Sequence, residues 1–239
     1  MNTAIIFAGG TGQRMNTTTK PKQFLELHGK PILIHTVEYF EKSSHIDAVI
    51  IVMLESWIPY TNELIEKYGF KKVCAVIPGG ESGQESIFKG LSKAAELFPK
   101  DTVVLLHDGV RPLINDEIIA KCVESTINNG NAITVSPAIE TVALMSGDGC
   151  VGKILPRSEC QMAKAPQCFK LGDIYESHLK AQKEGKYDFI DSASLMQYYG
   201  YKLYTVEGPV ENIKITTPSD FYIFRAIIDA RENSQIFGL

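Results

Sequence analysis

The residues best suited to chemistry follow the first apolar segment of the chain. The glycine-rich run Ala8-Gly9-Gly10-Thr11-Gly12 ends the segment Ala4–Ala8, and Arg14 and Lys22 come shortly after it. Glycines after a buried strand let the backbone approach a phosphate, whose charge the exposed N–H groups bind. Two cations beside such a loop suit phosphoryl or nucleotidyl transfer, in which the protein positions the substrate and neutralises charge. The alternative is a tight turn with exposed basic residues, which a lone glycine loop would favour.

Two common phosphate-binding motifs do not fit this loop. A dinucleotide-binding fingerprint needs a third glycine where this chain has Met15. A P-loop needs Gly-Lys-Ser/Thr at its end, and here Gly12 is followed by Gln13. The loop therefore predicts a different kind of phosphate site.

A second candidate loop is His107-Asp108-Gly109-Val110-Arg111-Pro112, after the apolar run Thr102–Leu106. Asp108 could hold ribose hydroxyls or Mg²⁺, and Arg111 could bind a phosphate through two hydrogen bonds. An Asp–Arg ion pair at the end of a strand is an equally good interpretation. His107 has no recognisable Ser or Cys partner, so we interpret it as structural.

Two further loops belong to the same set. Gly79-Gly80-Glu81-Ser82 follows the third apolar run, and Lys214 alternates with Ile213 and Ile215 and so points away from both. The alternative for Lys214 is a solvent-facing lysine. We expect the loops to converge on one edge of a sheet. The cations that they bring there are Arg14, Lys22, Arg111 and Lys214.

The elements that position these loops alternate between apolar strands and helices. Val- and Ile-rich runs predict buried parallel strands at Ala4–Ala8, Ala48–Leu54, Val73–Ile77 and Thr102–Leu106. Apolar residues at helical spacing predict helices at Pro31–Ser43, Trp57–Tyr68 and Glu85–Phe98. Repeated units of this kind indicate an α/β fold with a doubly wound, mostly parallel sheet, which binds ligands at the carboxyl ends of its strands.

The pattern changes after about residue 130. Short strands are predicted at Asn131–Pro137, Thr141–Met145 and Val151–Leu155, and Gly147-Asp148-Gly149 forms the turn of an antiparallel hairpin. Such a hairpin cannot bury both faces alone, so we expect it to reach a partner subunit. The remaining predicted elements are helices at Leu171–Lys183, Ser192–Tyr199 and Pro218–Arg231 and a strand at Tyr201–Val206. The whole chain, 1–239, is interpreted as one domain with a projecting arm at about 137–160.

The amino-acid composition excludes several classes of protein. Of 239 residues, 44% are hydrophobic and 22% charged, which excludes wholesale disorder. The net charge of −4 argues against a protein built to grip nucleic acid or an anionic membrane. Five cysteines without a C-x-x-C pair fit neither a disulfide framework nor a zinc site. With no signal peptide and no apolar run long enough to span a bilayer, we expect a cytoplasmic protein.

Taken in order, the motifs resemble a known family. The chain contains A-G-G-x-G-x-R-M, P-K-Q-F, G-G-x-x, H-D-x-x-R-P, A-P-Q-x-F and N-I-K-x-T. The set is similar to the polyol-phosphate cytidylyltransferases, whose acceptors include 2-C-methyl-D-erythritol 4-phosphate and ribitol 5-phosphate. The resemblance runs from about Ala4 to Phe221 and is specific as an ordered set. It implies a Rossmann-like nucleotidyltransferase fold, a homodimer with embracing hairpin arms, and Mg²⁺ or another divalent cation bound mainly through CTP, with Asp108 as a candidate ligand.

The resemblance also implies roles for individual residues. In-line attack by a polyol phosphate oxygen on CTP needs no covalent enzyme intermediate, and Arg157 would act in the neighbouring subunit's site. The implied catalytic residues are Arg14, Lys22 and Lys214. The implied CTP-binding residues are Ala8, Gly9, Gly10, Thr11, Gly12, Gly80, Glu81, Ser86 and Asp108. The implied polyol-phosphate-binding residues are Arg111, Thr141 and Arg157.

The branch of the family is a separate question. The first glycine loop, Phe24, Val110 and Thr216-Thr217-Pro218 resemble the ribitol branch, so CDP-ribitol is the favoured product. The alternative is the 2-C-methyl-D-erythritol 4-phosphate enzyme of isoprenoid biosynthesis. An NAD-dependent dehydrogenase and a non-catalytic nucleotide sensor are more remote alternatives. Gly83 and Glu211 depart from the family's usual pattern.

Overall fold

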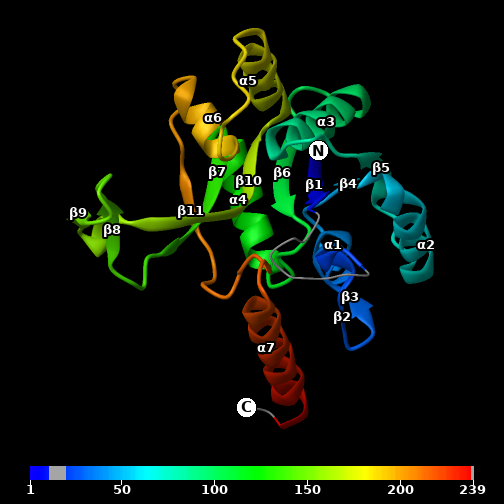
Figure 1. Ribbon diagram of the computed structural model, residues 1–239. Helices are drawn as coiled ribbons and strands as arrows, with labels where there is room; N and C mark the ends of the chain where they lie inside the picture. The colour runs from blue at the N-terminus through cyan, green and yellow to red at the C-terminus, as the bar shows by residue number, and fades with distance from the viewer. Residues whose placement is uncertain (11–19, 238–239) are drawn as a thin grey trace.

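The computed structural model describes residues 1–10 and 20–237, and this part of the chain contains a seven-stranded central sheet (Figure 1). The strand order is β11-β7-β10-β6-β1-β4-β5. Within the sheet, β10 runs antiparallel to both of its neighbours, and the other pairs are parallel. The strands are β1 (Asn2–Ala8), β4 (Ala48–Met53), β5 (Val73–Pro78), β6 (Val103–Asp108), β7 (Asn131–Pro137), β10 (Gln161–Lys170) and β11 (Thr205–Glu207).

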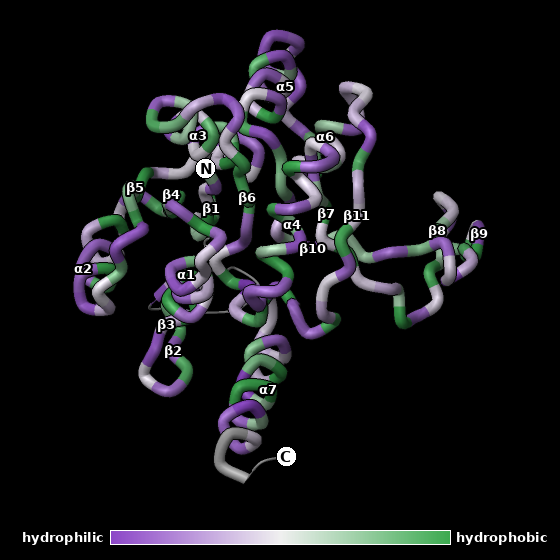
Figure 2. Tube along the Cα trace, turned by 180° about the vertical axis from the view of Figure 1, so that it is seen from behind, coloured by the Kyte–Doolittle hydropathy of each residue, from purple (hydrophilic) through white to green (hydrophobic). Residues whose placement is uncertain are grey.

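Helices cover both faces of the sheet. One face packs against α1 (Ile32–Lys42), α2 (Ile58–Tyr68) and α4 (Asp116–Asn129). The other packs against α3 (Gly83–Leu97), α5 (Leu171–Lys183) and α6 (Ser192–Tyr198). Successive residues of a strand point to opposite faces, so Ile6 joins the first core and Ile5 the second. From behind, hydropathy alternates along the helices, as expected where one helix face is buried (Figure 2).

The last helix anchors the segment that contains Lys214. In α7 (Pro218–Phe237), Phe224 is fully buried in a cluster that includes Ile32 and Ile215. Ile215 also donates its backbone N–H to the carbonyl of Val110, 2.9 Å away. These contacts attach the chain on either side of Lys214 to the loop after β6. Short elements, η2 (Lys22–Phe24), β2 (Glu26–Leu27) and β3 (Lys30–Pro31), complete this side of the molecule.

The predicted hairpin projects from the body as an arm. It consists of β8 (Val142–Met145) and β9 (Val151–Leu155), which pair antiparallel, followed by η4 (Arg157–Glu159). Figure 1 shows it extending sideways from the ends of β7 and β10. Its exposed apolar side chains include Leu144, Met145, Val151 and Ile154. A hairpin with this much uncovered apolar surface is a candidate contact surface.

The sequence interpretation of the fold is confirmed in outline and wrong in three places. The four parallel strands and three helices of the first half exist, but α4 and β10 were not predicted, and the strand expected at Tyr201–Val206 begins only at Thr205. Pro166 lies inside β10, and proline argues against a strand interior. The signal for α4 was present, since Asn115 caps it by accepting the backbone N–H of Ile118.

Two further features concern the cysteines and the length of the helices. All five cysteines are free thiols. Within residues 1–10 and 20–237, no helix combines the length and the apolar character that crossing a bilayer requires.

Candidate active site

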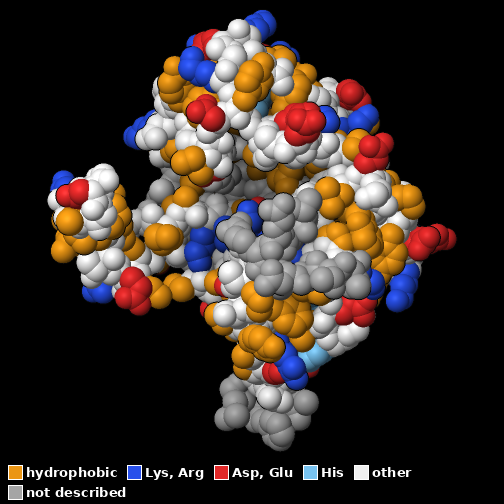
Figure 3. All heavy atoms as spheres, viewed as in Figure 1, with side chains coloured by type: hydrophobic (Ala, Val, Ile, Leu, Met, Phe, Trp, Pro, Cys, Tyr) orange, Lys and Arg blue, Asp and Glu red, His pale blue; other side chains and the backbone are white. Residues whose placement is uncertain are grey.

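A cleft of about 570 Å³ opens where β1, β5 and β6 end. Figure 3 shows Lys and Arg side chains around the hollow on this face. The predicted site residues that line the cleft are Ala8, Gly9, Gly10, Lys22, Gly80, Glu81, Ser86, Asp108, Arg111 and Lys214. The predicted convergence of the post-strand loops is therefore present in the folded chain.

Of the five remaining predicted residues, three are not described by the structure and two lie on the arm. Thr11, Gly12 and Arg14 lie outside the described residues. Thr141 and Arg157 lie on the arm, and both side chains are exposed there. The Arg157 guanidinium donates to the carbonyl of Ile139, 3.2 Å away, rather than to any group in the cleft of its own chain.

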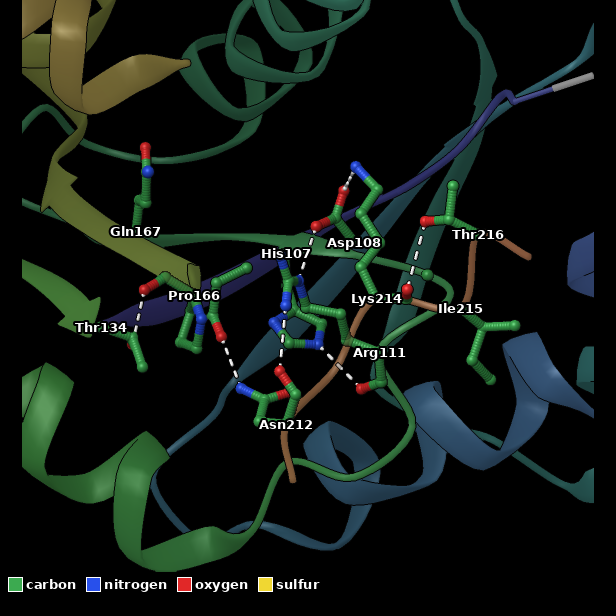
Figure 4. Close-up of polar contacts among 12 residues, drawn as sticks. His107, Asp108, Arg111, Thr134, Pro166, Gln167, Asn212, Lys214, Ile215 and Thr216 are labelled. Atoms are coloured by element: carbon green, nitrogen blue, oxygen red, sulfur yellow. Dashed lines mark hydrogen bonds and ion pairs between the residues drawn. The ribbon is translucent and has the colours of Figure 1, made fainter. Parts of the chain in front are cut away.

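An ion-pair chain runs through the middle of the cleft. Asp108 accepts from Arg111 Nε at 2.8 Å with one carboxylate oxygen and from Lys214 Nζ at 2.7 Å with the other (Figure 4). Burial disfavours the charged carboxylate, but Lys214 and Arg111 outweigh it and lower the pKa of Asp108 to about 2. The Asp–Arg pair that the sequence allowed does form. It forms inside the cleft, where Asp108 orients two cations.

Arg111 is held in place from two sides. Its guanidinium donates to the carbonyl of Asn212 at 2.9 Å, and its own carbonyl lies 3.2 Å from His107 Nε2 (Figure 4). Burial lowers the pKa of His107 to about 4, so the ring is neutral near neutral pH and donates through Nε2. His107 thus fixes the turn that presents Arg111, which matches the structural role expected from the sequence.

Lys22 comes from the other side of the cleft. It is only 8% exposed, and its ammonium donates to the carbonyl of Ile215 at 3.0 Å. A Cβ added to Gly10 would lie 3.8 Å from Lys22 Cε, so the lysine stem passes the first glycine loop. Gln23, the next residue, donates to the carbonyl of Ala8 at 2.6 Å and ties η2 to the end of β1. Lys22 is therefore buried and fixed beside the expected phosphate loop.

The loop after β5 is shaped by the start of α3. Ser82 caps α3 by accepting the N–H of Glu85, and Gly80 donates its N–H to Ser86 Oγ at 2.9 Å. A Cβ on Gly80 would overlap the Glu85 side chain, so the close approach requires glycine. The loop consequently presents backbone and short polar groups to the cleft, which suits recognition of a base and ribose.

Several lining residues had no role in the sequence interpretation, among them Gln167, Asp191 and Lys164. Gln167 donates to Asp191 at 2.8 Å, and Asp191 caps α6. Gln167 belongs to the A-P-Q-x-F motif, which could have suggested it. Lys164 also lines the cleft, and its placement depends on irregular pairing in β10 that no local pattern indicated.

Asp108 is the cleft carboxylate that the sequence analysis put forward as a magnesium ligand. Both oxygens of Asp108 already accept from cations, so the carboxylate has one remaining lone pair on each oxygen for an ion. Mg²⁺ commonly takes one or two carboxylates and completes its shell with substrate phosphates and water. Among the described residues, the carboxylate–histidine group close enough to hold a metal is His28, Asp229 and Glu232, none of which lines the cleft. Asp108 therefore fits an ion held mainly by a bound triphosphate.

Comparison with known proteins adds a consistent result. A sequence model of the family described as 2-C-methyl-D-erythritol 4-phosphate cytidylyltransferase matches residues 2–230. A ribitol-5-phosphate cytidylyltransferase of Vibrio parahaemolyticus is 53% identical over 238 residues, covering 100% of both chains. A 2-C-methyl-D-erythritol 4-phosphate cytidylyltransferase of Clostridium acetobutylicum is 37% identical over 95% of this chain and 97% of its own. Among solved structures, a 4-diphosphocytidyl-2C-methyl-D-erythritol synthase of Anaerococcus prevotii has a TM-score of 0.82 at 27% identity, covering 95% of this chain and 96% of that one.

Proposed function

Because the chain belongs to the 2-C-methyl-D-erythritol 4-phosphate cytidylyltransferase family, we propose that it is a CTP-dependent enzyme that converts ribitol 5-phosphate to CDP-ribitol and releases pyrophosphate. The observation that carries the choice of acceptor is the full-length 53% identity to a ribitol-5-phosphate enzyme, against 37% to an erythritol-phosphate enzyme. The two relatives share a reaction class, so the acceptor is the finer part of the proposal.

The cleft supplies the groups that this transfer requires. An oxygen of the acceptor phosphate bonds to the α-phosphorus of CTP, and the bond from that phosphorus to the β-phosphate oxygen breaks, so pyrophosphate leaves with the electron pair. The protein must stabilise the negative charge on the phosphoryl group that is transferred. Lys22 is a buried, fixed cation beside the glycine loop, and Arg111 and Lys214 are held by Asp108. In our proposal Lys22, Lys214 and Arg14 are the catalytic cations.

CTP would lie across the glycine loop and the start of α3. Backbone groups of Ala8, Gly9, Gly10, Thr11 and Gly12 would bind the triphosphate. Gly80, Glu81 and Ser86 would contact the base and ribose. Magnesium would enter as part of the CTP complex, offsetting triphosphate charge, and Asp108 is the carboxylate that would hold it. Arg111 would contact the acceptor.

The arm would complete the site of a second subunit. Its apolar side chains are exposed, and Thr141 and Arg157 do not line the cleft of their own chain. We therefore propose a homodimer in which the arm, about 137–160, carries Thr141 and Arg157 to the partner's acceptor phosphate. Residues 1–239 then form one catalytic domain with a dimerisation arm, working in the cytoplasm where CTP is available.

The test is pyrophosphate release with Mg²⁺ and CTP, measured with each polyol phosphate in a separate reaction. We expect release that requires CTP, falls to background without an acceptor, and is fastest with ribitol 5-phosphate. Faster release with 2-C-methyl-D-erythritol 4-phosphate would overturn the choice of acceptor. An absence of release with both acceptors would overturn the proposed reaction.

A further inference from the structure

Lys164 is a cleft cation for which neither the sequence motifs nor the proposed mechanism has a use. It lines the cleft on the side formed by β10, together with Ala163, Ala165 and Gln167. The neighbouring Pro166 and Gln167 lie to the left of Arg111 in Figure 4. The cleft lining therefore brings Lys164 of β10 together with Arg111 and Lys214.

The pairing of β10 with β7 is irregular at Lys164, and this irregularity positions the Lys164 side chain. Ala163 pairs with Val135 of β7, and the next paired residue of β10, Gln167, faces Ile133. The stretch Lys164–Pro166 thus opposes the single residue Thr134, which donates to the carbonyl of Pro166 at 2.7 Å. Such bulges re-aim side chains and are common beside active sites. Here the bulge lies where β10 reaches the cleft.

The ammonium of Lys164 has no carboxylate partner within hydrogen-bond distance among the described residues. It donates to the carbonyl oxygens of Val210 at 2.6 Å and Pro209 at 3.4 Å. The carboxylate of Glu211 raises the pKa of Lys164 only through its charge, and it is paired with Arg231 at 3.0 Å. Burial, followed by the charge of Arg111, lowers the pKa of Lys164. A half-buried cation beside a second cation is a site that an anion would stabilise.

The proposed reaction brings two separate phosphate groups into one cleft. The triphosphate belongs with the glycine loop and Lys22 at the end of β1, and the acceptor phosphate must approach the α-phosphorus from another direction. In the sheet, β6 separates β10, which carries Lys164, from β1, to whose end Gln23 attaches η2 and therefore Lys22. Asp108 offsets much of the charge of Arg111 and Lys214, whereas Lys164 retains its own.

We propose that Lys164 is a further substrate-binding residue whose ammonium binds the phosphate of the acceptor, beside Arg111. This inference rests on the proposed function and extends it by assigning an acceptor contact within the same chain. Two neutral carbonyls hold the side chain at the cleft wall, and a dianionic phosphate forms a stronger hydrogen bond with an ammonium than a carbonyl does. Lys164 therefore contributes to affinity for the acceptor and not for CTP.

The test uses Lys164→Met, the conservative variant Lys164→Arg, and Lys170→Met as a matched control. Lys170 lies on the same strand and also donates to a carbonyl, that of Asp101, but does not line the cleft. Steady-state kinetics are measured with CTP and ribitol 5-phosphate varied in turn. We expect Lys164→Met to raise the KM for ribitol 5-phosphate about 10-fold to 100-fold, since it removes a charged hydrogen bond. We expect the KM for CTP to change by less than about twofold and Lys164→Arg to recover much of the loss.

The outcomes separate this proposal from its alternatives. If Lys164 were purely structural, its loss would act through the Pro209–Val210 segment and disturb the neighbouring Lys214. Both kcat and the KM for CTP would then change, and the KM for ribitol 5-phosphate would change by no larger a factor than these two. That result, or an unchanged KM for ribitol 5-phosphate in Lys164→Met, overturns the assignment while the wild-type reaction stands. If the wild-type protein transfers to no polyol phosphate, the proposed function fails, and the acceptor role of Lys164 fails with it.

Discussion

The first prediction concerns Lys22, the most buried cation among the described residues of the cleft. Lys22→Met keeps an unbranched, apolar stem of similar shape and removes the ammonium, which donates to the Ile215 carbonyl at 3.0 Å. Two unit charges about 4 Å apart at an effective dielectric constant of about 20 interact by about 4 kcal/mol. Only the part of that interaction that strengthens in the transition state raises kcat.

The magnitude follows from comparable losses. Removing one preorganised donor from a transition-state oxyanion costs about 3–4 kcal/mol, or about 100-fold to 1,000-fold in kcat. We expect a fall of this size in the rate of pyrophosphate release by Lys22→Met at saturating CTP and ribitol 5-phosphate. The stability cost is smaller. Leaving the buried Ile215 carbonyl without this donor costs about 1–3 kcal/mol, so the variant stays folded if the wild-type stability is typical of a domain.

The matched control is Lys20→Met. Lys20 is close in sequence, but its side chain is 46% exposed, lies 3.8 Å from Glu26 and is not part of the cleft lining. We expect its kcat to stay within about twofold of the wild-type value. A Lys22→Met protein that melts cooperatively, binds CTP and retains near-wild-type kcat would refute the assignment of Lys22 to the transition state.

Three further predictions address packing, acid stability and the arm. Gly90→Ala places a Cβ 2.7 Å from the buried Ile5 Cγ2, so urea denaturation should show a loss of about 1–3 kcal/mol; an unchanged midpoint would contradict this packing of α3. Burial lowers the pKa of His178 to about 4, whereas a histidine in the unfolded chain has a pKa of about 6.5. The contribution of the buried neutral ring to stability is therefore fully present above about pH 6.5, and it is lost as the pH falls through about 4. His178→Gln should flatten the pH dependence of the unfolding free energy over that window, and a slope equal to wild type would count against it. Arg157→Ala mixed with Lys22→Ala should recover partial activity if the arm acts in the partner's site, and no recovery in proven mixed dimers would exclude a shared site.

Much of the fold could be predicted because its signals are local. The runs at β1, β4 and β6 are continuous apolar stretches rich in Ile, Val, Leu and Ala, as expected of strands buried on both faces. Once the strands are parallel, their carboxyl ends share an edge, so the loops with Lys22 and Asp108 had to converge. The hairpin was equally local, with its turn at Gly147-Asp148-Gly149.

The remainder depends on contacts between distant parts of the chain. Asp108 and Lys214 are 106 positions apart, and their ion pair follows from the docking of Phe224 and Ile215. The position of Lys164 depends on a bulge that is created by pairing with β7. Neither feature leaves a periodic pattern in the sequence, so residue spacing alone could suggest which groups take part but not how they pair.

The most direct test of the central claim is a competition between acceptors. The wild-type protein is given CTP, Mg²⁺ and equal amounts of ribitol 5-phosphate and 2-C-methyl-D-erythritol 4-phosphate, and the two CDP-linked products are separated by mass. Their initial ratio equals the ratio of the two kcat/KM values. We predict CDP-ribitol in at least about tenfold excess, which corresponds to about 1.4 kcal/mol of transition-state discrimination. An excess of the erythritol product would contradict the proposed function.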